Sequence, residues 1–316
     1  MFHHDDPLSA LLTRQRIVLV DGALATELER AGADLRDPLW SARMLLDEPQ
    51  RIRAVHDAYF AAGADIAITA TYQATFEGFA RRGVTHAAAA ALMRDAVKIA
   101  IDARTAFVAS QTATVTAVHP LVAASVGPYG AFLADGSEYR GDYALDEDAL
   151  VAWHRERFHL LAGSGADLLA CETIPCGAEA GAYLRLLDEL PHARAWISFS
   201  ARDGEHISNG ERFADLAAEI GQHRQVVAVG VNCTAPEHVS PLVLAAHAVT
   251  ETPIIVYPNS GETYDGASHR WTGTATCDAF VDDAQRWIDA GATVIGGCCR
   301  TTPADIAALH AYLRRA

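Results

Sequence analysis

Short apolar stretches alternate with longer amphipathic stretches along almost the whole chain. The apolar stretches are nearly continuous runs of Val, Ile, Leu and Ala, and they lie at 17–21, 65–70, 121–127, 167–172, 195–200, 226–231, 254–258 and 293–297. Continuous apolar strands are typical of a parallel sheet that is covered on both faces. Between and after them, apolar residues recur with helical spacing, as in Ile52, Val55 and Tyr59. The pattern predicts eight strands that alternate with eight helices.

A turn of small residues joins an amphipathic stretch to the next apolar stretch at three places. These turns contain Gly63, Gly165 and Gly291, each next to alanine, and glycine suits the left-handed residue that ends a helix. Eight such units in 316 residues fit a closed (β/α)8 barrel of the TIM type better than an open doubly wound sheet, whose Gly-rich nucleotide signature is missing. We predict an N-terminal arm at 1–16 and one barrel domain at 17–316.

The composition narrows the possible partners and the location. Hydrophobic residues make up 50% of the chain and charged residues 21%, which is ordinary for a globular protein. The net charge of −15 argues against binding to nucleic acid or to an anionic membrane surface. The sequence offers neither a secretory signal nor an apolar stretch long enough to span a bilayer, so we expect a cytoplasmic protein without a membrane partner.

Three cysteines follow two of the predicted strands. Cys233 follows the sixth strand, and Cys298 and Cys299 follow the eighth. Because the active site of a (β/α)8 barrel lies at the C-terminal ends of the strands, all three side chains are expected at its mouth. Three thiolates and one open position describe a catalytic Zn²⁺ site. Cysteines are also often small buried hydrophobic residues, and the spacing alone does not decide between the two interpretations.

Two carboxylates also follow predicted strands. Glu172 comes directly after a buried apolar run, where an unpaired charge would be costly, so it favours a functional role. Asp21 follows the first strand, and a turn or helix cap is the alternative role for it.

The chain resembles the homocysteine S-methyltransferase family over nearly its whole length. The matching segments are Asp21-Gly22-Ala23, Gly136-Ser137-Glu138-Tyr139-Arg140-Gly141, Glu172-Thr173-Ile174-Pro175, Gly230-Val231-Asn232-Cys233, Tyr257-Pro258-Asn259-Ser260-Gly261-Glu262 and Gly296-Gly297-Cys298-Cys299. The segments that end in Cys233 and Cys299 resemble the zinc-binding signature of the family. The segment 136–141 resembles the branch that uses S-methylmethionine as the methyl donor.

The resemblance implies a reaction and a set of site residues. A Zn²⁺ ion held by Cys233, Cys298 and Cys299 would bind homocysteine as its thiolate, and a methyl group would pass to it from S-methylmethionine, with S-adenosylmethionine as a second possible donor. Asp21 and Glu172 are expected at the amino group of homocysteine. By their position at strand ends only, backbone N–H groups at Gly22 and near Thr71 and Ser125 are candidates for its carboxylate, and Asn232 is expected to orient the zinc site or the substrate.

Two long connections are expected to form the donor pocket. They lie at 128–146 and 258–277, and long connections in a compact domain often bind ligands. They carry aromatic side chains whose faces attract a methylsulfonium, although the same residues could be packing anchors. These residues are Tyr129, Tyr139, Tyr143, Tyr264 and Trp271.

Four alternative functions remain at this point. Selenocysteine or another small thiol could replace homocysteine, and betaine could replace the sulfonium donor. The chain could also be a barrel that binds zinc or thiols without catalysis. An aldolase-like enzyme is disfavoured, because Lys98 is the only lysine and lies within a predicted helix rather than at a strand end.

Overall fold

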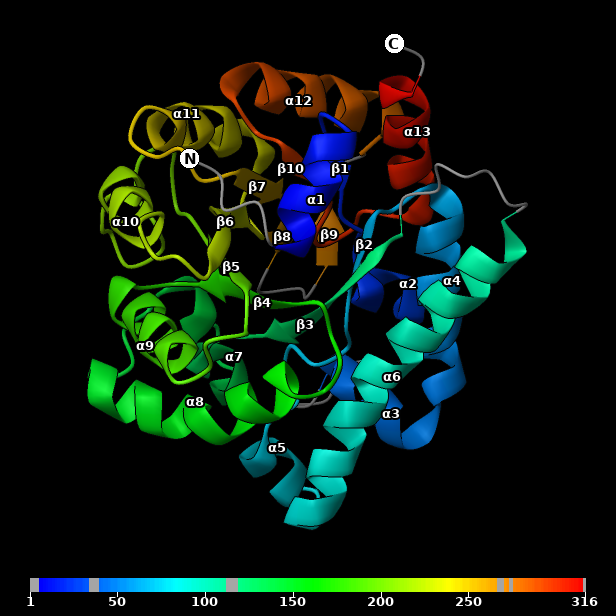
Figure 1. Cartoon of the computed structure of the whole chain (residues 1–316), viewed down its shortest axis with the longest axis vertical. Coiled ribbons are helices and arrows are strands. Elements are labelled where there is room, and N and C mark those ends of the chain that lie inside the picture. Colours follow the sequence, from blue (N-terminus) through cyan, green and yellow to red (C-terminus); the bar gives the residue numbers. More distant parts are fainter. Residues whose placement is uncertain (1–5, 34–39, 112–118, 266–269, 273–274, 315–316) are drawn as a thin grey trace.

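Eight parallel strands form the centre of the molecule. The computed structural model describes residues 6–33, 40–111, 119–265, 270–272 and 275–314. The strands are β1 (Val18–Leu19), β2 (Ile66–Ile68), β3 (Leu121–Val126), β4 (Leu168–Ile174), β5 (Ala195–Phe199), β6 (Val226–Asn232), β7 (Ile254–Tyr257) and β10 (Val294–Ile295). They lie in the order β1-β10-β7-β6-β5-β4-β3-β2. A parallel bridge between Val20 and Ile66 joins the two edges, so the sheet closes into a barrel (Figure 1).

Helices surround this barrel, as the predicted alternation requires. The eight helices of the repeating units are α4 (Pro49–Ala62), α6 (His86–Ser110), α8 (Glu147–Ala162), α9 (Gly177–Asp188), α10 (Phe213–Ile220), α11 (Pro236–His247), α12 (Cys277–Ala290) and α13 (Pro303–Leu313). Proline begins α4, α11 and α13, where the missing N–H group leaves no helical hydrogen bond unmade. Gly63 ends α4 in the left-handed conformation. The predicted (β/α)8 barrel is therefore confirmed.

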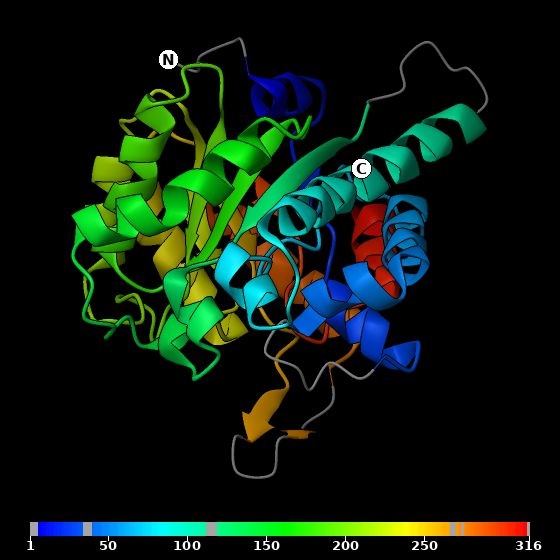
Figure 2. The same cartoon turned by 90° about the horizontal axis from the view of Figure 1, so that it is seen from below.

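Several short elements were not predicted. They are α1 (Pro7–Arg14), α2 (Leu24–Arg30), η1 (Trp40–Arg43), α3 (Met44–Asp47), α5 (Phe76–Ala80), α7 (Tyr129–Leu133), η2 (Ser137–Tyr139) and the hairpin β8 (Thr263–Asp265) with β9 (Arg270–Thr272). Asp6 caps α1, and Leu8 and Leu11 of this helix join the apolar core inside the barrel. Figure 2 shows α1 at one end of the barrel and the β8–β9 hairpin projecting from the opposite end. The stretch predicted as an arm thus contains a helix that covers the barrel end away from the strand C-termini.

The core has two layers because side chains of a strand alternate between the two faces. In β3, Leu121 and Ala123 point into the barrel, whereas Val122 and Ala124 pack against the helices. The same alternation in β4 turns Cys171 toward the helices and Glu172 toward the barrel interior. Within the described residues, no helix is both long and apolar enough to cross a membrane.

Candidate active site

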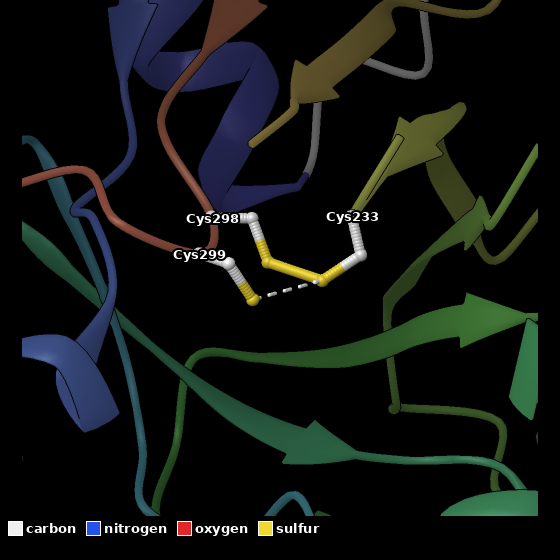
Figure 3. Close-up of side chains that lie close together, drawn as sticks. All are labelled: Cys233, Cys298 and Cys299. Atoms are coloured by element: carbon white, nitrogen blue, oxygen red, sulfur yellow. Dashed lines mark hydrogen bonds between the residues drawn. A yellow bond between two sulfur atoms is a disulfide. The ribbon is translucent and has the colours of Figure 1, made fainter. Parts of the chain in front are cut away.

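The structure brings Cys233, Cys298 and Cys299 together at the C-terminal end of the barrel. The three Sγ atoms all lie within 4.8 Å of one another. Cys233 and Cys298 are joined as a disulfide, and the Sγ atoms of Cys233 and Cys299 are 4.0 Å apart (Figure 3). Cys233, which follows β6, and Cys298, which follows β10, are 65 positions apart in the sequence and therefore meet only through the fold.

The local backbone explains how these side chains converge. Cys233 follows β6 with φ 47°, in the left-handed region, so its side chain leaves the alternation of the strand. The N–H group of Cys298 donates to the carbonyl of Pro258 at 2.7 Å, and the N–H group of Ser260 donates to the carbonyl of Cys299 at 3.0 Å. The segments after β7 and β10 thus support each other. Gly297 permits close packing, since a Cβ atom there would lie 2.2 Å from the Thr301 hydroxyl.

The three sulfurs fit a soft divalent metal ion in chemical type and in mutual distance. Three thiolates leave a tetrahedral ion with one position for an exogenous ligand. Such binding requires the reduced form, because a disulfide between Cys233 and Cys298 ties up two of the three ligands. Burial raises the pKa of the Cys299 thiol to about 11, so this thiol ionises only beside a compensating charge.

Glu172 stands at the centre of the polar part of the site. The pairing of β4 with β5 shifts in register between Cys171 and Ile174, which is the kind of irregularity that re-aims side chains at the end of a strand. The Ser125 hydroxyl donates a hydrogen bond to Glu172 Oε1. The Tyr257 hydroxyl also contacts this carboxyl group. Burial outweighs both contacts and raises the Glu172 pKa to about 7.

Asp21 is the second buried carboxylate of the mouth. Its Oδ2 atom accepts a hydrogen bond from the N–H group of Ile68 at 2.9 Å, which ties the end of β1 to β2. Burial raises the Asp21 pKa well above its usual range, and the negative charge of Glu172 raises it further. Burial disfavours the charged form of both Asp21 and Glu172, so a cation such as an ammonium group would compensate both carboxylates.

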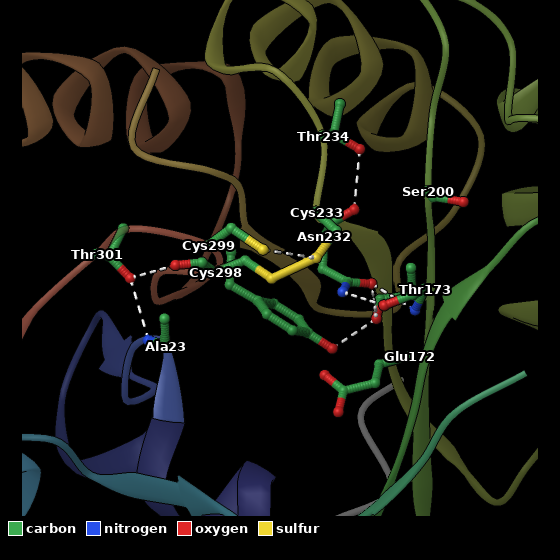
Figure 4. The surroundings of a disulfide bond; sticks show 12 residues. Ala23, Glu172, Thr173, Ser200, Asn232, Cys233, Thr234, Cys298, Cys299 and Thr301 are labelled. Carbon is green, nitrogen blue, oxygen red and sulfur yellow. Dashed lines mark hydrogen bonds between the residues drawn. A yellow bond between two sulfur atoms is a disulfide. The ribbon is translucent and has the colours of Figure 1, made fainter. Parts of the chain in front are cut away.

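Asn232 organises the turn that carries Glu172. Its Oδ1 atom accepts hydrogen bonds from the Thr173 N–H group at 2.7 Å and from the Ser198 hydroxyl at 2.8 Å. Its Nδ2 atom donates to the Thr173 hydroxyl at 2.7 Å (Figure 4). Thr173 has φ 59°, so these bonds hold a residue in a conformation that its side chain disfavours. Asn232 therefore fixes the conformation of Thr173, the residue next to Glu172.

Thr71, Ser125 and Gly22 lie around the same carboxylates. The N–H groups of Thr71 and Ser125 already donate to Thr69, to its carbonyl at 2.8 Å and to its hydroxyl at 3.1 Å. In the structure these two groups thus serve the protein's own hydrogen bonds. Gly22 is packed so closely that a Cβ atom would lie 2.7 Å from the Tyr59 hydroxyl. The assignment of these residues to the substrate carboxylate stays a prediction.

The aromatic residues of the long connections divide into two groups. Tyr129 and Tyr143 pack on one another and on the apolar core, as anchors do. Tyr139 lies in η2 and is 47% exposed, so its ring does not anchor the core. Burial of its hydroxyl raises the pKa of that group, and the charges of Cys299 and Glu138 add to the shift. Tyr264 and Trp271 belong to β8 and β9, and their side chains lie outside the described residues.

A buried polar network supports the turn after β3. Glu179 of α9 accepts a hydrogen bond from the Tyr129 N–H group at 2.6 Å and lies 2.7 Å from His154 Nε2. Arg157 donates to the carbonyl of Gly127 at 2.5 Å. Burial raises the Glu179 pKa to about 8 and lowers that of His154, so a carboxyl group faces a neutral imidazole. Sequence reasoning missed this network, because the side chains that form it, Glu179, His154 and Arg157, lie on helices and give no strand-end signal.

Two further contacts at the mouth were also missed. Tyr257 receives a hydrogen bond from Trp196 at 2.9 Å and lies 2.6 Å from the Ser198 hydroxyl, so the inner face of β5 supports the Glu172 partner. Arg300 donates to Glu262 at 2.6 Å and joins the segment after β10 to the segment after β7. Ser198 and Tyr257 lie near strand ends, and this position was the sequence signal that could have identified them as site residues.

Comparison with known proteins identifies close relatives. The family model described as homocysteine S-methyltransferase matches residues 18–313. The homocysteine S-methyltransferase YbgG of Bacillus subtilis is 51% identical over 309 residues, which cover 98% of each chain. The selenocysteine Se-methyltransferase of Brassica oleracea var. italica is 47% identical, and the match covers 93% of this chain and 88% of that protein.

A solved structure resembles the whole molecule. The metallated form of the homocysteine methyltransferase MmuM from Escherichia coli superposes with a TM-score of 0.87 at 49% sequence identity. The match covers 97% of this chain and all of the other chain. The similarity therefore extends over the barrel and the segments that form its mouth.

Proposed function

Because the chain belongs to the homocysteine S-methyltransferase family and is a methyltransferase, we propose that it methylates the thiol of L-homocysteine with a sulfonium donor, in the first place S-methylmethionine. The proposal also assigns Zn²⁺ to Cys233, Cys298 and Cys299. It is carried by one observation, the convergence of three cysteine sulfurs within 4.8 Å of one another at the barrel end that holds Asp21 and Glu172.

The reaction transfers a methyl group between two sulfur atoms. A bond forms between the homocysteine sulfur and the methyl carbon, the bond from that carbon to the donor sulfur breaks, and the thiol proton is released. Bound at the three cysteines, Zn²⁺ would hold the homocysteine thiol in its ionised, nucleophilic form. The donor sulfur takes the electron pair of the broken bond and leaves as a neutral thioether. The leaving step therefore needs no general acid, and the protein mainly positions its substrates.

The chain's own residues supply this positioning. Asp21 and Glu172 would pair with the ammonium group of homocysteine, which compensates the two charges that burial otherwise disfavours. Ser125 and Tyr257 orient the Glu172 carboxyl group, and Asn232 fixes the turn behind it. Loss of any of these contacts is expected to weaken homocysteine binding before it changes the metal site.

The test is methionine formation from homocysteine and S-methylmethionine, measured before chelation, after chelation, and after Zn²⁺ is added back. The proposal expects turnover that disappears with the metal and returns with it, together with one zinc per chain by elemental analysis. Full turnover by metal-free protein would overturn the zinc assignment. Absence of product with S-methylmethionine, S-adenosylmethionine and betaine alike would favour the non-catalytic interpretation.

Selenocysteine is a second candidate acceptor. The observation behind it is the 47% identity to a selenocysteine Se-methyltransferase over most of both chains. A soft metal ion selects the sulfur or selenium atom rather than the rest of the acceptor. The ratio of kcat/KM for selenocysteine to that for homocysteine, with one fixed donor, decides between them.

A further inference from the structure

One carboxylate at the mouth has no function in the scheme above. Glu138 belongs to η2, in the connection after β3, and its Oε2 atom is buried without a hydrogen-bond partner in the described part of the chain. Its backbone is held firmly, because the Ser200 hydroxyl donates to the Glu138 carbonyl at 2.9 Å. A Cβ atom at Gly130 would lie 2.4 Å from the Glu138 nitrogen, so α7 packs directly against this position. Glu138 is therefore a half-buried residue on a fixed backbone, with one buried acceptor atom.

The neighbouring arginine does not neutralise Glu138 by contact. Arg140 donates to Asp142 at 3.2 Å, to the Ser137 hydroxyl at 3.1 Å and to the carbonyl of Asp135 at 3.1 Å. Burial accordingly dominates at Glu138 and raises the pKa of its carboxyl group. The charge of Arg140 offsets this effect only in part, and a buried carboxylate oxygen that contacts no cation is costly unless a ligand brings the positive charge.

Hydrogen bonds connect the backbone of Glu138 to the segment that carries Cys233. Ser200, whose hydroxyl donates to the Glu138 carbonyl, precedes Ala201, and the Ala201 N–H group donates at 3.0 Å to the hydroxyl of Thr234, the residue after Cys233. A ligand that extends from the sulfur cluster across the end of β5 would thus reach Glu138.

Other buried acceptors at the mouth also lack partners. Among the described residues that follow the strands, the buried side-chain polar atoms without a hydrogen bond are Gln73 Oε1, Glu138 Oε2 and Asn259 Oδ1. They follow β2, β3 and β7, and all three are acceptors. Such a set suits a ligand that brings hydrogen-bond donors and positive charge.

We propose that Glu138 binds the α-ammonium group of an amino-acid methyl donor. This inference rests on the proposed function, because that reaction brings two amino acids and therefore two ammonium groups to the mouth. Asp21 and Glu172 would take the ammonium of homocysteine, and Glu138 that of the donor. Glu138 is then the residue that selects a sulfonium amino acid over a sulfonium compound without an amino group.

The chemistry favours the ammonium over the sulfonium as the partner. The sulfonium loses its positive charge as the methyl group leaves, so a carboxylate beside it would stabilise the ground state more than the transition state. The ammonium keeps its charge throughout the reaction. A carboxylate paired with the ammonium stabilises the ground state and the transition state equally. Its loss should therefore raise the KM for the donor and leave kcat unchanged.

The test compares two donors in the metallated enzyme. S-Methylmethionine carries an α-ammonium group, and dimethylsulfoniopropionate carries the same sulfonium and a carboxylate but no amino group. For Glu138→Gln we expect a dissociation constant for S-methylmethionine, measured calorimetrically, that is about tenfold or more above the wild-type value. The dissociation constant for dimethylsulfoniopropionate and the KM for homocysteine should stay unchanged. Asp142→Asn, an exposed change in the same connection, should alter none of these values.

Equal weakening of both donors would overturn the assignment, as would unchanged binding of S-methylmethionine. Circular dichroism and zinc content show whether a variant is folded, and Glu138→Ala and Glu138→Asp provide folded alternatives, of which only the aspartate variant should keep part of the donor preference. The wild-type assay separates this inference from the proposed function. A wild type that binds S-methylmethionine but forms no methionine would refute the proposed function. The dissociation constants of the Glu138 variants would still show whether Glu138 binds the donor ammonium group.

Discussion

Asn232 holds Thr173 in a left-handed conformation through hydrogen bonds to both its backbone N–H group and its hydroxyl, each 2.7 Å long. Asn232 is the last residue of β6, and Thr173 lies near the end of β4, so the contact passes over the intervening strand β5. The residue before Cys233 thereby fixes the residue after Glu172. The sulfur cluster and the carboxylate site are linked through this one side chain.

Replacement of this side chain should impair substrate binding more than metal binding. In Asn232→Ala the buried Thr173 N–H group loses its partner, which costs about 1–3 kcal/mol of folding free energy. We expect a lower Tm and a higher KM for homocysteine, with zinc content retained. Gln285→Ala is the matched control, because it removes an amide that also bonds through its nitrogen and its oxygen, but on the exposed side of α12. A variant with unchanged KM would show that Thr173 does not position Glu172.

Variants of the cysteines in the sulfur cluster should contain less zinc than a variant of a cysteine outside it. Cys298→Ser and Cys299→Ser each remove a soft ligand, so we expect zinc below one equivalent per chain and loss of methionine formation. Cys277→Ser changes a residue at the start of α12, outside the sulfur cluster, and should retain both. Elemental analysis after gel filtration makes the comparison. Full zinc content in Cys298→Ser would remove this residue from the ligand set.

Glu172 should make ligand binding depend on pH. Its pKa of about 7 means that the carboxyl group is protonated in more than half of the molecules below that pH and cannot pair fully with an ammonium group. We expect the dissociation constant for L-methionine, whose thioether does not titrate, to rise up to about tenfold per unit as the pH falls below 7. Glu172→Gln should bind weakly at every pH. Zinc content measured at each pH controls for loss of the metal, and a parallel pH profile in both proteins would contradict the assignment.

Glu179 should lower stability at alkaline pH. Its carboxyl pKa is raised from 4.5 to about 8, so the native state keeps a proton that the unfolded state releases between these values. The free energy of unfolding should therefore decrease as the pH rises through this range, by up to about 5 kcal/mol for such a shift. Glu179→Gln keeps a neutral hydrogen-bonding group beside His154 and Tyr129. Its stability relative to the wild type should therefore increase from pH 5 to pH 8.5.

Urea unfolding of both proteins at the two pH values measures this difference. Glu189→Gln, an exposed change next to the end of the same helix, should show no such gain at high pH. A constant difference between Glu179→Gln and the wild type across the range would show that Glu179 is ionised in the native state.

The barrel itself was predictable because eight buried strands and eight amphipathic helices leave a strong periodic signal. The predicted strand at 167–172 corresponds to β4 at Leu168–Ile174, and the other strands agree to within a few residues. Short elements such as α7 and η2 were not predicted, because five and three residues are too few for a hydrophobic period to be recognised. Helix α1 was not predicted although Asp6 and Pro7 are a start signal, because its eight residues make too few turns for a clear hydrophobic period.

Three sulfurs at one end of the barrel were predictable from strand order, but the orientation of the side chains there was not. Thr173, Cys233 and Arg300 all have positive φ, at 59°, 47° and 70°. Residue preferences disfavour that conformation for each of them, so it depends on tertiary contacts such as those from Asn232. The buried partners of Glu179 were equally inaccessible, since the sequence does not show which helical polar residues face each other.

Gly230 shows how closely the barrel is packed beneath the sulfur cluster. It lies on the inner face of β6, three residues before Cys233, and pairs in register with Ile255 of β7. A Cβ atom at this position would lie 1.7 Å from the Ile255 carbonyl oxygen, so the two strands can adopt their spacing only with glycine here. Gly230→Ala should therefore cost about 3 kcal/mol or more of folding free energy and displace Cys233. Gly163→Ala is the control, because the nearest atom to its Cβ would be 3.4 Å away. Urea unfolding and zinc affinity measure the two effects, and a Gly230→Ala protein with wild-type values would show that the strands separate without cost.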